Sequence, residues 1–315
     1  MAKPTIHFFC PDLPRVLGGI RQTYRHVDVL NANGFDAWIV HRRRFKIEWF
    51  EHDTRVMYQP VKMKSEDIAV YSEIGGPKIS EWSPGNRKAV LNQNAYYSFM
   101  GYPLLEEAKT PYMHAEVVAA IVVSEDSKRY LEYVFPKLPI HRIRYSIDPK
   151  LYYITGRKKK QICFMPRKNL EDARQVLNIL RYRKALEGWK VVAIEKKSQA
   201  EAAEILRNSL IFMSFGHPEG FGLPPAEAMA AGCITVGYHG NVREFFTPEH
   251  GFPIEMGQIL DYARTVEEVI QRFSTDIEGL RRIAKAAAAF VQEEYSQEKE
   301  RESIVGCWEK VLGGH

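Results

Sequence analysis

Short apolar runs alternate along the chain with longer stretches whose apolar residues recur every three or four positions. The first run, Thr5 to Cys10, predicts a buried strand, and a loop containing Gly18-Gly19 follows it. Apolar residues at helical spacing from Ile20 to Leu30 then predict a helix that ends near Gly34, before a strand from Ala37 to Val40. A strand, a helix and a strand in this order predict a parallel sheet.

The same alternation continues through the chain and restarts after a polar stretch from Gly156 to Lys160. Before that stretch the pattern predicts strands at Lys88–Leu91, Ala120–Val123 and Arg142–Tyr145 and a helix at Ser127–Val134. After it the pattern predicts strands at Ile162–Met165, Lys190–Ile194 and Leu210–Ser214 and helices at Leu170–Leu186 and Gln199–Asn208. From Thr265 onward the chain is mainly helical, and its last helix runs from Glu298 to Leu312.

Two series of alternating strands and helices predict two domains. A chain of 315 residues is longer than one compact core usually covers. We therefore expect an α/β protein with two Rossmann-like, doubly wound parallel-sheet domains. The predicted boundaries are residues 1–157 for the first domain, 158–296 for the second and 297–315 for a C-terminal helix.

Composition places the chain among globular proteins, with 45% hydrophobic and 26% charged residues. No two of the cysteines have the spacing of a metal or redox motif, so we expect free thiols in a reducing compartment; they are Cys10, Cys163, Cys233 and Cys307. The first apolar run ends by Asp12, which does not fit an export signal. The run Val117–Val123 is far shorter than the ~20 residues of a membrane span. These features predict a cytoplasmic protein.

Basic residues are concentrated in the first half of the chain. Residues 1–160 contain 25 Lys and Arg against 17 Asp and Glu, whereas residues 161–315 contain 19 against 22. The clusters Arg42–Arg44 and Lys158–Lys160 could contact an anionic membrane surface or an acidic substrate, or simply form a solvated basic face. No nucleic-acid recognition module accompanies them, so we expect no nucleic-acid partner.

The segment from His217 to Gly232 has the composition of an anion-binding turn. It follows a predicted buried strand and opens a short helix, because proline is tolerated in the first turn and Gly232 can end the helix. The first N–H groups of a helix have no internal partners, and the helix dipole favours negative charge there. Glycines at 220 and 222 allow close approach of the backbone. We therefore expect a diphosphate to bind against Gly222 and Leu223.

Two carboxylates, Glu219 and Glu227, flank this turn with seven residues between them. Carboxylates accept hydrogen bonds from hydroxyl groups, so Glu227 suits the two ribose hydroxyls of a nucleotide and Glu219 suits hydroxyls of a sugar. A lone Gly-x-Gly often marks only a turn, and a glutamate early in a helix often only complements its dipole. The order of strand, acid, Gly-x-Gly, prolines, acid, Ala-rich helix, glycine and strand is far more specific than either feature alone.

At these residues the chain resembles glycosyltransferase family 4, the retaining group 1 glycosyltransferases of GT-B fold. Glu219-Gly220-Phe221-Gly222-Leu223-Pro224 followed by Glu227-Ala228-Met229-Ala230 is similar to the family's Glu-x7-Glu signature. Gly18-Gly19 resembles the N-terminal glycine loop that lies against the donor, and Arg167-Lys168 resembles the basic pair that binds pyrophosphate. The resemblance implies two Rossmann-like domains facing across a cleft, with the last helix packing back on the first domain.

The resemblance also implies roles for individual residues. Catalysis is assigned to Glu219, Arg167 and Lys168, and donor binding to Gly18, Gly19, Gly220, Phe221, Gly222, Leu223 and Glu227. Candidate cleft residues are Asn92, Asn94, His217 and Asn241. The chain departs from the family at two places, because Pro166 replaces the usual glycine before Arg167, and Asn92-Gln93-Asn94 stands where many relatives carry a histidine.

The implied reaction moves a sugar from a nucleotide-diphosphate donor to a sugar, glycan or lipid-linked acceptor with retention of configuration. The donor phosphate itself takes the acceptor's proton in this family, so no side-chain base is implied. No Asp-x-Asp motif occurs in the sequence, so the cations and the helix start are left to neutralise the leaving group, and we expect no cofactor and no metal.

Two other classes of function remain open. The chain could be a catalytically silent nucleotide-sugar binding protein, because its first domain looks short for this family. It could also be a sugar-nucleotide epimerase or a phosphorylase of the same architecture. A dinucleotide dehydrogenase is disfavoured, because no Gly-x-Gly-x-x-Gly follows the first strand.

Overall fold

The computed structural model describes residues 3–13, 16–44 and 46–313, and it divides into two compact units. The N-terminal unit reaches Tyr145 and includes the chain from Glu298 onward, while the C-terminal unit is Ser146–Gln297. The boundary predicted after residue 157 differs from this division, because the segment after Tyr145 already bonds within the C-terminal unit: the Ile147 N–H donates to the Tyr295 carbonyl at 2.9 Å. The outer ends of the predicted domains, residues 1–2 and 314–315, lie outside the described residues.

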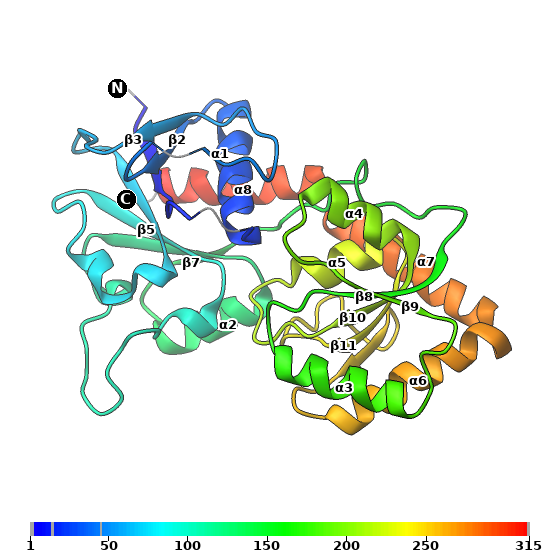
Figure 1. Ribbon diagram of the computed structural model, residues 1–315. Coiled ribbons are helices and arrows are strands. Elements are labelled where there is room, and N and C mark those ends of the chain that lie inside the picture. The colour runs from blue at the N-terminus through cyan, green and yellow to red at the C-terminus, as the bar shows by residue number, and fades with distance from the viewer. Residues whose placement is uncertain (1–2, 14–15, 45, 314–315) are drawn as a thin grey trace. The chain divides into compact units, whose positions relative to one another are not determined.

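The N-terminal unit is built on a seven-stranded parallel sheet in the order β3-β2-β1-β4-β5-β6-β7 (Figure 1). Its strands are β1 Thr5–Phe9, β2 Asp36–His41, β3 Val56–Tyr58, β4 Ile68–Ser72, β5 Arg87–Asn92, β6 Val117–Val122 and β7 Ile140–Arg142. Its helices are α1 Gly18–Ala32, α2 Glu125–Val134 and α8 Gln297–Gly313, with short 3₁₀ helices η1 Glu73–Ser80, η2 Ala95–Tyr97 and η3 Pro111–Met113.

Three features of this unit differ from the sequence prediction. The pattern did not indicate β3 or β4, which are only three and five residues long. The strand expected at Arg142–Tyr145 is β7, which ends at Arg142 because the Arg144 N–H turns away to the Ser303 hydroxyl of α8 at 2.9 Å. Gly18 and Gly19 do not form a loop but begin α1. Glycine costs little in a first helical turn, because the N–H groups there have no helical partners.

The C-terminal unit is built on a five-stranded parallel sheet in the order β12-β11-β10-β8-β9. Its strands are β8 Lys159–Phe164, β9 Lys190–Ala193, β10 Ser209–Ser214, β11 Ile234–Tyr238 and β12 Phe252–Ile254. Its helices are α3 Leu170–Tyr182, α4 Gln199–Asn208, α5 Leu223–Ala230, α6 Ile259–Thr275 and α7 Ile277–Glu294. Two parallel-sheet α/β units confirm the predicted fold class.

The predicted helix Leu170–Leu186 ends four residues early, at Tyr182. Lys184 has a φ of 60°, in the left-handed region that ends helices, and the Ala185 N–H donates back to the Leu180 carbonyl at 2.9 Å. A non-glycine residue therefore supplies this stop. Sequence patterns signal such stops mainly through glycine or asparagine, so the early end was not visible in advance.

Helix α8 packs within the N-terminal unit. The Trp308 indole is fully buried, its ring centroid lies 5.7 Å from that of Phe8, and its Nε1–H donates to His26 Nε2 at 2.7 Å. Burial lowers the pKa of His26 to about 3, so its imidazole is neutral and can accept this bond. A fully buried Trp side chain contributes roughly 1.5–3 kcal/mol or more through burial alone. The last helix is therefore part of the N-terminal unit's core.

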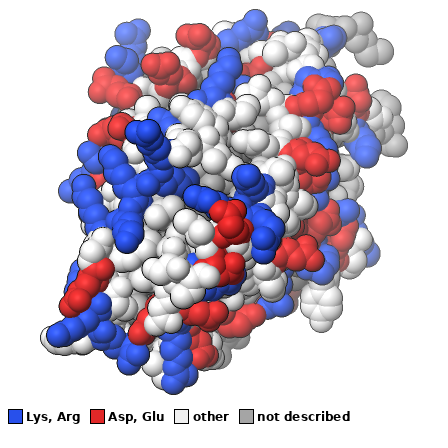
Figure 2. Space-filling model, turned by 90° about the vertical axis from the view of Figure 1, so that its right-hand side faces the viewer, with Lys and Arg blue, Asp and Glu red and all other residues white. Residues whose placement is uncertain are grey.

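Basic side chains are not confined to the N-terminal half of the chain. Figure 2 shows Lys and Arg side chains gathered on one area of the face at the right of Figure 1, where the C-terminal unit lies. Exposed basic residues of this unit include Lys159, Lys160, Lys184 and Lys190. Lys158 differs from its two neighbours, because it is partly buried and its ammonium donates to the Ser209 carbonyl at 2.8 Å. The predicted cluster Lys158–Lys160 is thus only partly a surface feature.

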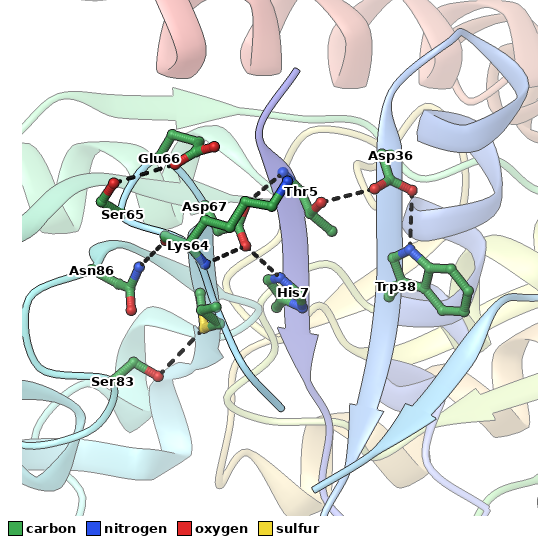
Figure 3. Close-up of polar contacts among 11 residues, drawn as sticks. Thr5, His7, Asp36, Trp38, Lys64, Ser65, Glu66, Asp67, Ser83 and Asn86 are labelled. Carbon is green, nitrogen blue, oxygen red and sulfur yellow. Dashed lines mark hydrogen bonds and ion pairs between the residues drawn. The ribbon is translucent and has the colours of Figure 1, made fainter. Parts of the chain in front are cut away.

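A polar network fixes the amino-terminal edge of the first sheet. The buried Asp67 carboxylate, just before β4, accepts the N–H groups of Thr5 and Lys64 at 2.9 Å each and lies 3.3 Å from His7 Nε2 (Figure 3). Backbone hydrogen bonds to this carboxylate hold its pKa below the usual range, although burial acts in the opposite direction. Asp67 therefore aligns β1 with β4 at the edge away from the loops that follow the strands.

Candidate active site

The candidate site lies where two strand connections of the second sheet diverge. Strands β8 and β10 are neighbours, but α3 leads from β8 to β9 on one side, while α5 leads from β10 to β11 on the other. Such a switch point leaves an open place at the carboxyl ends of the strands, where α/β proteins bind ligands. The residues there are Met165–Asn169 after β8 and Phe215–Gly222 after β10.

An ion pair joins these two loops. Lys168 Nζ lies 3.0 Å from Glu219 Oε1 and donates to the Pro218 carbonyl at 2.6 Å. The two charged side chains are 17% and 18% exposed, so the pair is accessible but largely desolvated. A pair in this environment is more strongly coupled than a surface pair. Two residues that the sequence assigned to one site are therefore in direct contact.

Glycines enclose the Glu219 side chain. A Cβ atom on Gly216 would lie 2.6 Å from Glu219 Oε1, and one on Gly240 would lie 2.8 Å from Glu219 Cβ. The Glu219 N–H also donates to the Gly240 carbonyl at 2.9 Å. Gly240 has a φ of 66°, in the region that favours glycine. The position of this carboxylate thus depends on the loop after β11, from which the sequence analysis had named only Asn241.

Asn169 is a structural residue of the site that the sequence analysis missed. Its amide donates to the Phe215 carbonyl at 2.8 Å and to the His217 carbonyl at 3.3 Å, and its own backbone is left-handed, with a φ of 47°. Asparagine adopts this conformation more readily than most residues. Asn169 therefore ties the β8 loop to the β10 loop beside the ion pair. The signal was an Asn directly after a basic pair, at the start of a helix.

The start of α5 offers few backbone donors. Gly222 is the residue before the helix and is left-handed, with a φ of 82°. Pro224 and Pro225 have no N–H, so the first turn presents the N–H of Leu223 beside that of Gly222. No side chain caps this end of the helix in the described structure. The helix start can therefore accept an anion at the two residues that the sequence indicated.

Two motif residues next to this turn are buried. The Phe221 ring packs against Phe245 and Tyr295, with centroids 5.4 and 4.8 Å away. Its side chain therefore belongs to the core, and only its backbone can serve a ligand. Glu227 on α5 is 5% exposed. A carboxylate at that depth is rarely retained without polar partners.

Two histidines lie next to the ion pair. Burial, followed by electrostatic interactions with His239 and Lys168, lowers the pKa of His217, although Glu219 opposes this shift. The His217 ring is therefore neutral at pH 7. His239 Nδ1 accepts the Asn241 N–H at 3.1 Å, and its Nε2 lies 3.2 Å from the Glu255 carboxylate.

Asn241 thus enters the site through its backbone, which is left-handed with a φ of 72°. His239 and Glu255 were not identified from the sequence, because they are brought to this loop from β11 and from beyond β12.

Arg167 has a different environment from Lys168. Its side chain is exposed, and it forms no hydrogen bond or ion pair with any residue of the described ranges. Arg167 and Lys168, which the sequence predicts to act together, therefore have different environments in this structure. Lys168 is held by the loop after β10, whereas Arg167 is available to solvent and to ligands.

Gly19 in the N-terminal unit meets the chain after β5. The Gln93 amide donates to the Gly19 carbonyl at 3.0 Å and lies 3.2 Å from the Thr23 hydroxyl. A Cβ on Gly19 would lie 2.2 Å from Gln93 Oε1. Gly19 therefore allows this close approach at the carboxyl edge of the first sheet. Gln93, rather than its two Asn neighbours, is the side chain presented to α1.

Asn92 and Asn94 do not behave as cleft residues. Asn92 is fully buried, and its amide donates to Ser98 Oγ at 2.8 Å and to the Tyr112 hydroxyl at 2.6 Å. Asn94 is 5% exposed and caps η2 by accepting the Tyr96 N–H at 3.1 Å. Asparagine commonly takes such turn positions because its side chain bonds to the nearby backbone. The prediction that these two side chains face a cleft is wrong.

The sequence is similar to that of known glycosyltransferases. Residues 175–290 match the family described as Glycosyl transferases group 1. An alpha-1,6-glucosyltransferase of Actinobacillus pleuropneumoniae is 26% identical over 232 residues, which are 69% of this chain and 68% of that protein.

Solved structures of similar fold include sucrose-phosphate synthase from Thermosynechococcus elongatus, with a TM-score of 0.71, 13% identity and coverage of 99% and 100% of the two chains. Anabaena HepE in complex with UDP-glucose has a TM-score of 0.67, 12% identity and coverage of 97% and 99%. The matched residues 175–290 contain the whole segment from Glu219 to Glu227. The chain therefore has the GT-B fold, and its residues 175–290 are similar to the group 1 glycosyltransferases.

Proposed function

We propose that this glycosyltransferase moves a sugar from a nucleoside diphosphate donor to a sugar, glycan or lipid-linked acceptor and retains the anomeric configuration. The observation that carries the proposal is the Lys168–Glu219 pair at the switch point, next to the start of α5. It combines a cation for a phosphate with a carboxylate for sugar hydroxyls. A dinucleotide or purely structural role would need no such combination.

In this proposal Lys168 and Arg167 neutralise the charge that develops on the leaving diphosphate. Groups already oriented toward developing charge in a partly desolvated site contribute strongly to catalysis. Lys168 has this property, because Pro218 and Glu219 hold its ammonium in place. Arg167 is exposed and would be recruited by the donor. The N–H groups of Gly222 and Leu223 complete the phosphate site.

The two carboxylates of the motif then divide the rest of the donor between them. Glu219 accepts hydroxyl hydrogens of the transferred sugar, and the buried Glu227 accepts those of the ribose. The acceptor's proton passes to the donor phosphate, so no side-chain base takes part. Neither step requires a metal ion or another cofactor, because protein cations and backbone N–H groups supply the positive charge.

Partners and location follow from the same proposal. HepE, which shares the fold, has been solved with UDP and with UDP-glucose, so UDP-sugars are the first donors to test. Among the described residues, no helix combines the length and apolar character needed to cross a bilayer. We propose a cytoplasmic enzyme that touches the inner membrane face through the exposed residues Arg42–Arg44.

The test begins with thermal shifts of the purified chain in a panel of nucleoside diphosphates and their sugar conjugates. A ligand that binds only the folded state raises Tm, so selective stabilisation names the donor. Donor consumption is then followed with and without EDTA, and the configuration of the product is read by NMR. A turnover that EDTA abolishes would overturn the metal-free mechanism. Inversion at the anomeric carbon would overturn retention.

Two variants separate binding from catalysis. We expect Glu227→Ala to weaken nucleotide binding, and Arg167→Ala to lower turnover more than affinity. Glu249→Ala, an exposed acid of the same unit, is the matched control for the first, and Arg157→Ala, which is also exposed, for the second. Nucleotide binding without any donor consumption would favour the silent binding protein. Full activity in both test variants would exclude the assigned roles.

A further inference from the structure

A polar cavity lies in the N-terminal unit, and none of its lining residues belongs to the candidate active site. It has a volume of about 400 Å³ and is bounded by α2, β7 and α8. β7 is the last strand of its sheet, so one side of it is left to these two helices. The volume falls within the range of small-molecule sites. The cavity is part of one compact unit, because all of its lining residues belong to the N-terminal unit.

Cationic side chains dominate the lining. Lys128 comes from α2, Arg142 and Arg144 from β7 and the residues after it, and Lys310 from α8. The acidic residues are Glu125 and Glu302. Glu125 is already paired with Arg142 at 3.0 Å, and Lys128 lies 3.7 Å from Glu132 on its own helix, but the lining still holds four basic residues against two acidic ones. The balance therefore favours an anion over a cation.

The pKa of His141 indicates that lysines from two helices act on the same side chain. Burial lowers the pKa of its imidazole, and the positive charges of Lys310 and Lys128 lower it further. Two lysines from different helices thus act on the same ring between them. Lys310 is exposed and forms no ion pair with any residue of the described ranges. The lining also holds the Cys307 thiol, but burial raises its pKa to about 12, so it carries no competing negative charge at neutral pH.

Hydrogen-bond donors accompany the charges. The Ser303 hydroxyl accepts the Arg144 N–H at 2.9 Å and donates to the Glu300 carbonyl at 2.9 Å, which fixes the chain after β7 against α8. Guanidinium groups bind phosphate oxygens in a directional manner, while ammonium groups act as point charges. The cavity offers both kinds. We propose that it binds a phosphate monoester, carried either by a soluble metabolite or by a lipid headgroup.

The first experiment uses inorganic phosphate as the probe and the His141 ring as the reporter. The ring resonances are followed by NMR during a phosphate titration at constant pH and are assigned with His141→Gln. An anion bound beside the imidazole favours its protonated form, so we expect the pKa of His141 to rise when phosphate is present. Phosphate that leaves both the His141 shifts and this pKa unchanged would overturn the proposal.

Charge variants sharpen this test. We expect Lys310→Glu to weaken phosphate binding at the His141 reporter about tenfold and Glu302→Gln to strengthen it about threefold, as expected for charges about 5 Å from the ligand in a solvated groove. Both residues are exposed, so folding should be kept. Lys62→Glu makes the same charge change at an exposed site of the same unit outside the cavity. Equal effects of Lys310→Glu and Lys62→Glu would contradict a local site.

A second arm separates the two sources of phosphate. Vesicles of phosphatidylcholine with one-fifth phosphatidic acid are compared with pure phosphatidylcholine vesicles in a sedimentation assay. Retention by phosphatidic acid that Lys310→Glu abolishes and Lys62→Glu keeps assigns a lipid headgroup. Phosphate binding at His141 without vesicle retention assigns a soluble phosphate monoester. Absence of both overturns the proposal, whether or not the donor-site variants behave as expected.

Discussion

The carboxyl edges of the two sheets carry different chemistry. In the C-terminal unit the loops after neighbouring strands meet through charges, with Lys168 Nζ 3.0 Å from Glu219 and both side chains partly exposed. In the N-terminal unit the chain after β5 meets the start of α1 through neutral groups, with Gln93 donating to the Gly19 carbonyl at 3.0 Å. Next to this contact the acid Glu73 is buried, and burial raises its pKa to about 7.

The carboxyl edge of the C-terminal sheet can therefore stabilise a charge that develops during a reaction. The contact between α1 and the chain after β5 in the N-terminal unit instead fixes the local backbone. A charged side chain in a partly exposed site can bind either a protein group or a ligand. A buried hydrogen bond between neutral groups mainly fixes the backbone. The Ser72 hydroxyl donates to Glu73 at 2.7 Å, and the Gln93 and Asn94 N–H groups also bond to this carboxyl. Glu73 therefore positions the loop that carries Gln93. The two edges can be tested separately.

The largest expected effect is that of Lys168→Met. The substitution keeps the side chain's length but removes the charge that faces the leaving diphosphate, so donor consumption should fall about 100- to 1,000-fold. Nucleotide affinity should fall much less, because the helix start still binds phosphate. Steady-state kinetics and calorimetric titration measure the two quantities. Lys190→Met, at an exposed position on β9, is the matched control and should leave both unchanged.

If Lys168→Met kept its turnover, the charged edge would not be catalytic. Loss of affinity and turnover in equal measure would instead indicate a binding role for Lys168.

Gly240→Ala should have the next largest effect, on stability and activity together. Its Cβ would lie 2.8 Å from Glu219 Cβ and 2.9 Å from the Gly216 carbonyl, at a backbone φ of 66°. We expect a loss of roughly 2–4 kcal/mol in the free energy of unfolding. Gly257→Ala is the control, since Gly257 also has a positive φ, 84°, but nothing lies within 4 Å of its Cβ.

Gly257→Ala should lower the free energy of unfolding by only about 1 kcal/mol, because alanine is strained at the positive φ but meets no steric clash. Chemical denaturation of both variants measures the difference between them. Equal losses would mean that the packing around Glu219 contributes nothing.

Much of the fold was visible in the sequence, because apolar periodicity follows directly from which face of an element is buried. Strand β10 and helix α4 begin and end within one residue of their predicted positions. The failures have local causes. Strand β3 is a three-residue edge strand with too few positions to show alternation. Helix α3 ends at Tyr182, because Lys184 takes a left-handed conformation that sequence patterns associate with glycine.

The site was predictable only where one segment contains it. Glu219, Gly222 and Glu227 lie within one short motif, and the structure keeps them together around the start of α5. Asn169 and His239 reach the site from other strands and carry no spacing signal. Asn92 did carry a sequence signal, because a polar residue at a strand end is typical of a ligand-binding position. In the structure its side chain instead donates hydrogen bonds to the buried hydroxyls of Ser98 and Tyr112.

Glu73→Gln tests the second edge through pH. The pKa of Glu73 is raised to about 7 by burial, so the folded state binds this proton more tightly than the unfolded state does. Its contribution to stability is therefore full below the unfolded pKa near 4.5 and is lost as pH rises through about 7. We expect a difference on the order of 2–3 kcal/mol between the two ends of this window.

Glu73→Gln removes that dependence, whereas other groups still titrate in both proteins. The lowered pKa of His26 makes stability rise with pH over part of the same range, so only the difference between the two proteins is informative. Urea denaturation at half-unit pH steps measures it. Parallel curves for the two proteins would show that Glu73 has the same pKa in the folded and unfolded states, contrary to the raised pKa.

The smallest expected effect concerns the Gly19–Gln93 contact. A Cβ on Gly19 would lie 2.2 Å from Gln93 Oε1, but the far end of a glutamine side chain can rotate away, so Gly19→Ala should cost about 1 kcal/mol or less. Removing the obstructing group in Gly19→Ala/Gln93→Ala should recover part of this cost. The double-mutant cycle should therefore give a coupling energy of about 0.5–1 kcal/mol, measured by denaturation. Strict additivity would mean that the two residues do not meet in solution. A coupling in stability together with unchanged donor consumption would show that this edge fixes shape without taking part in the chemistry.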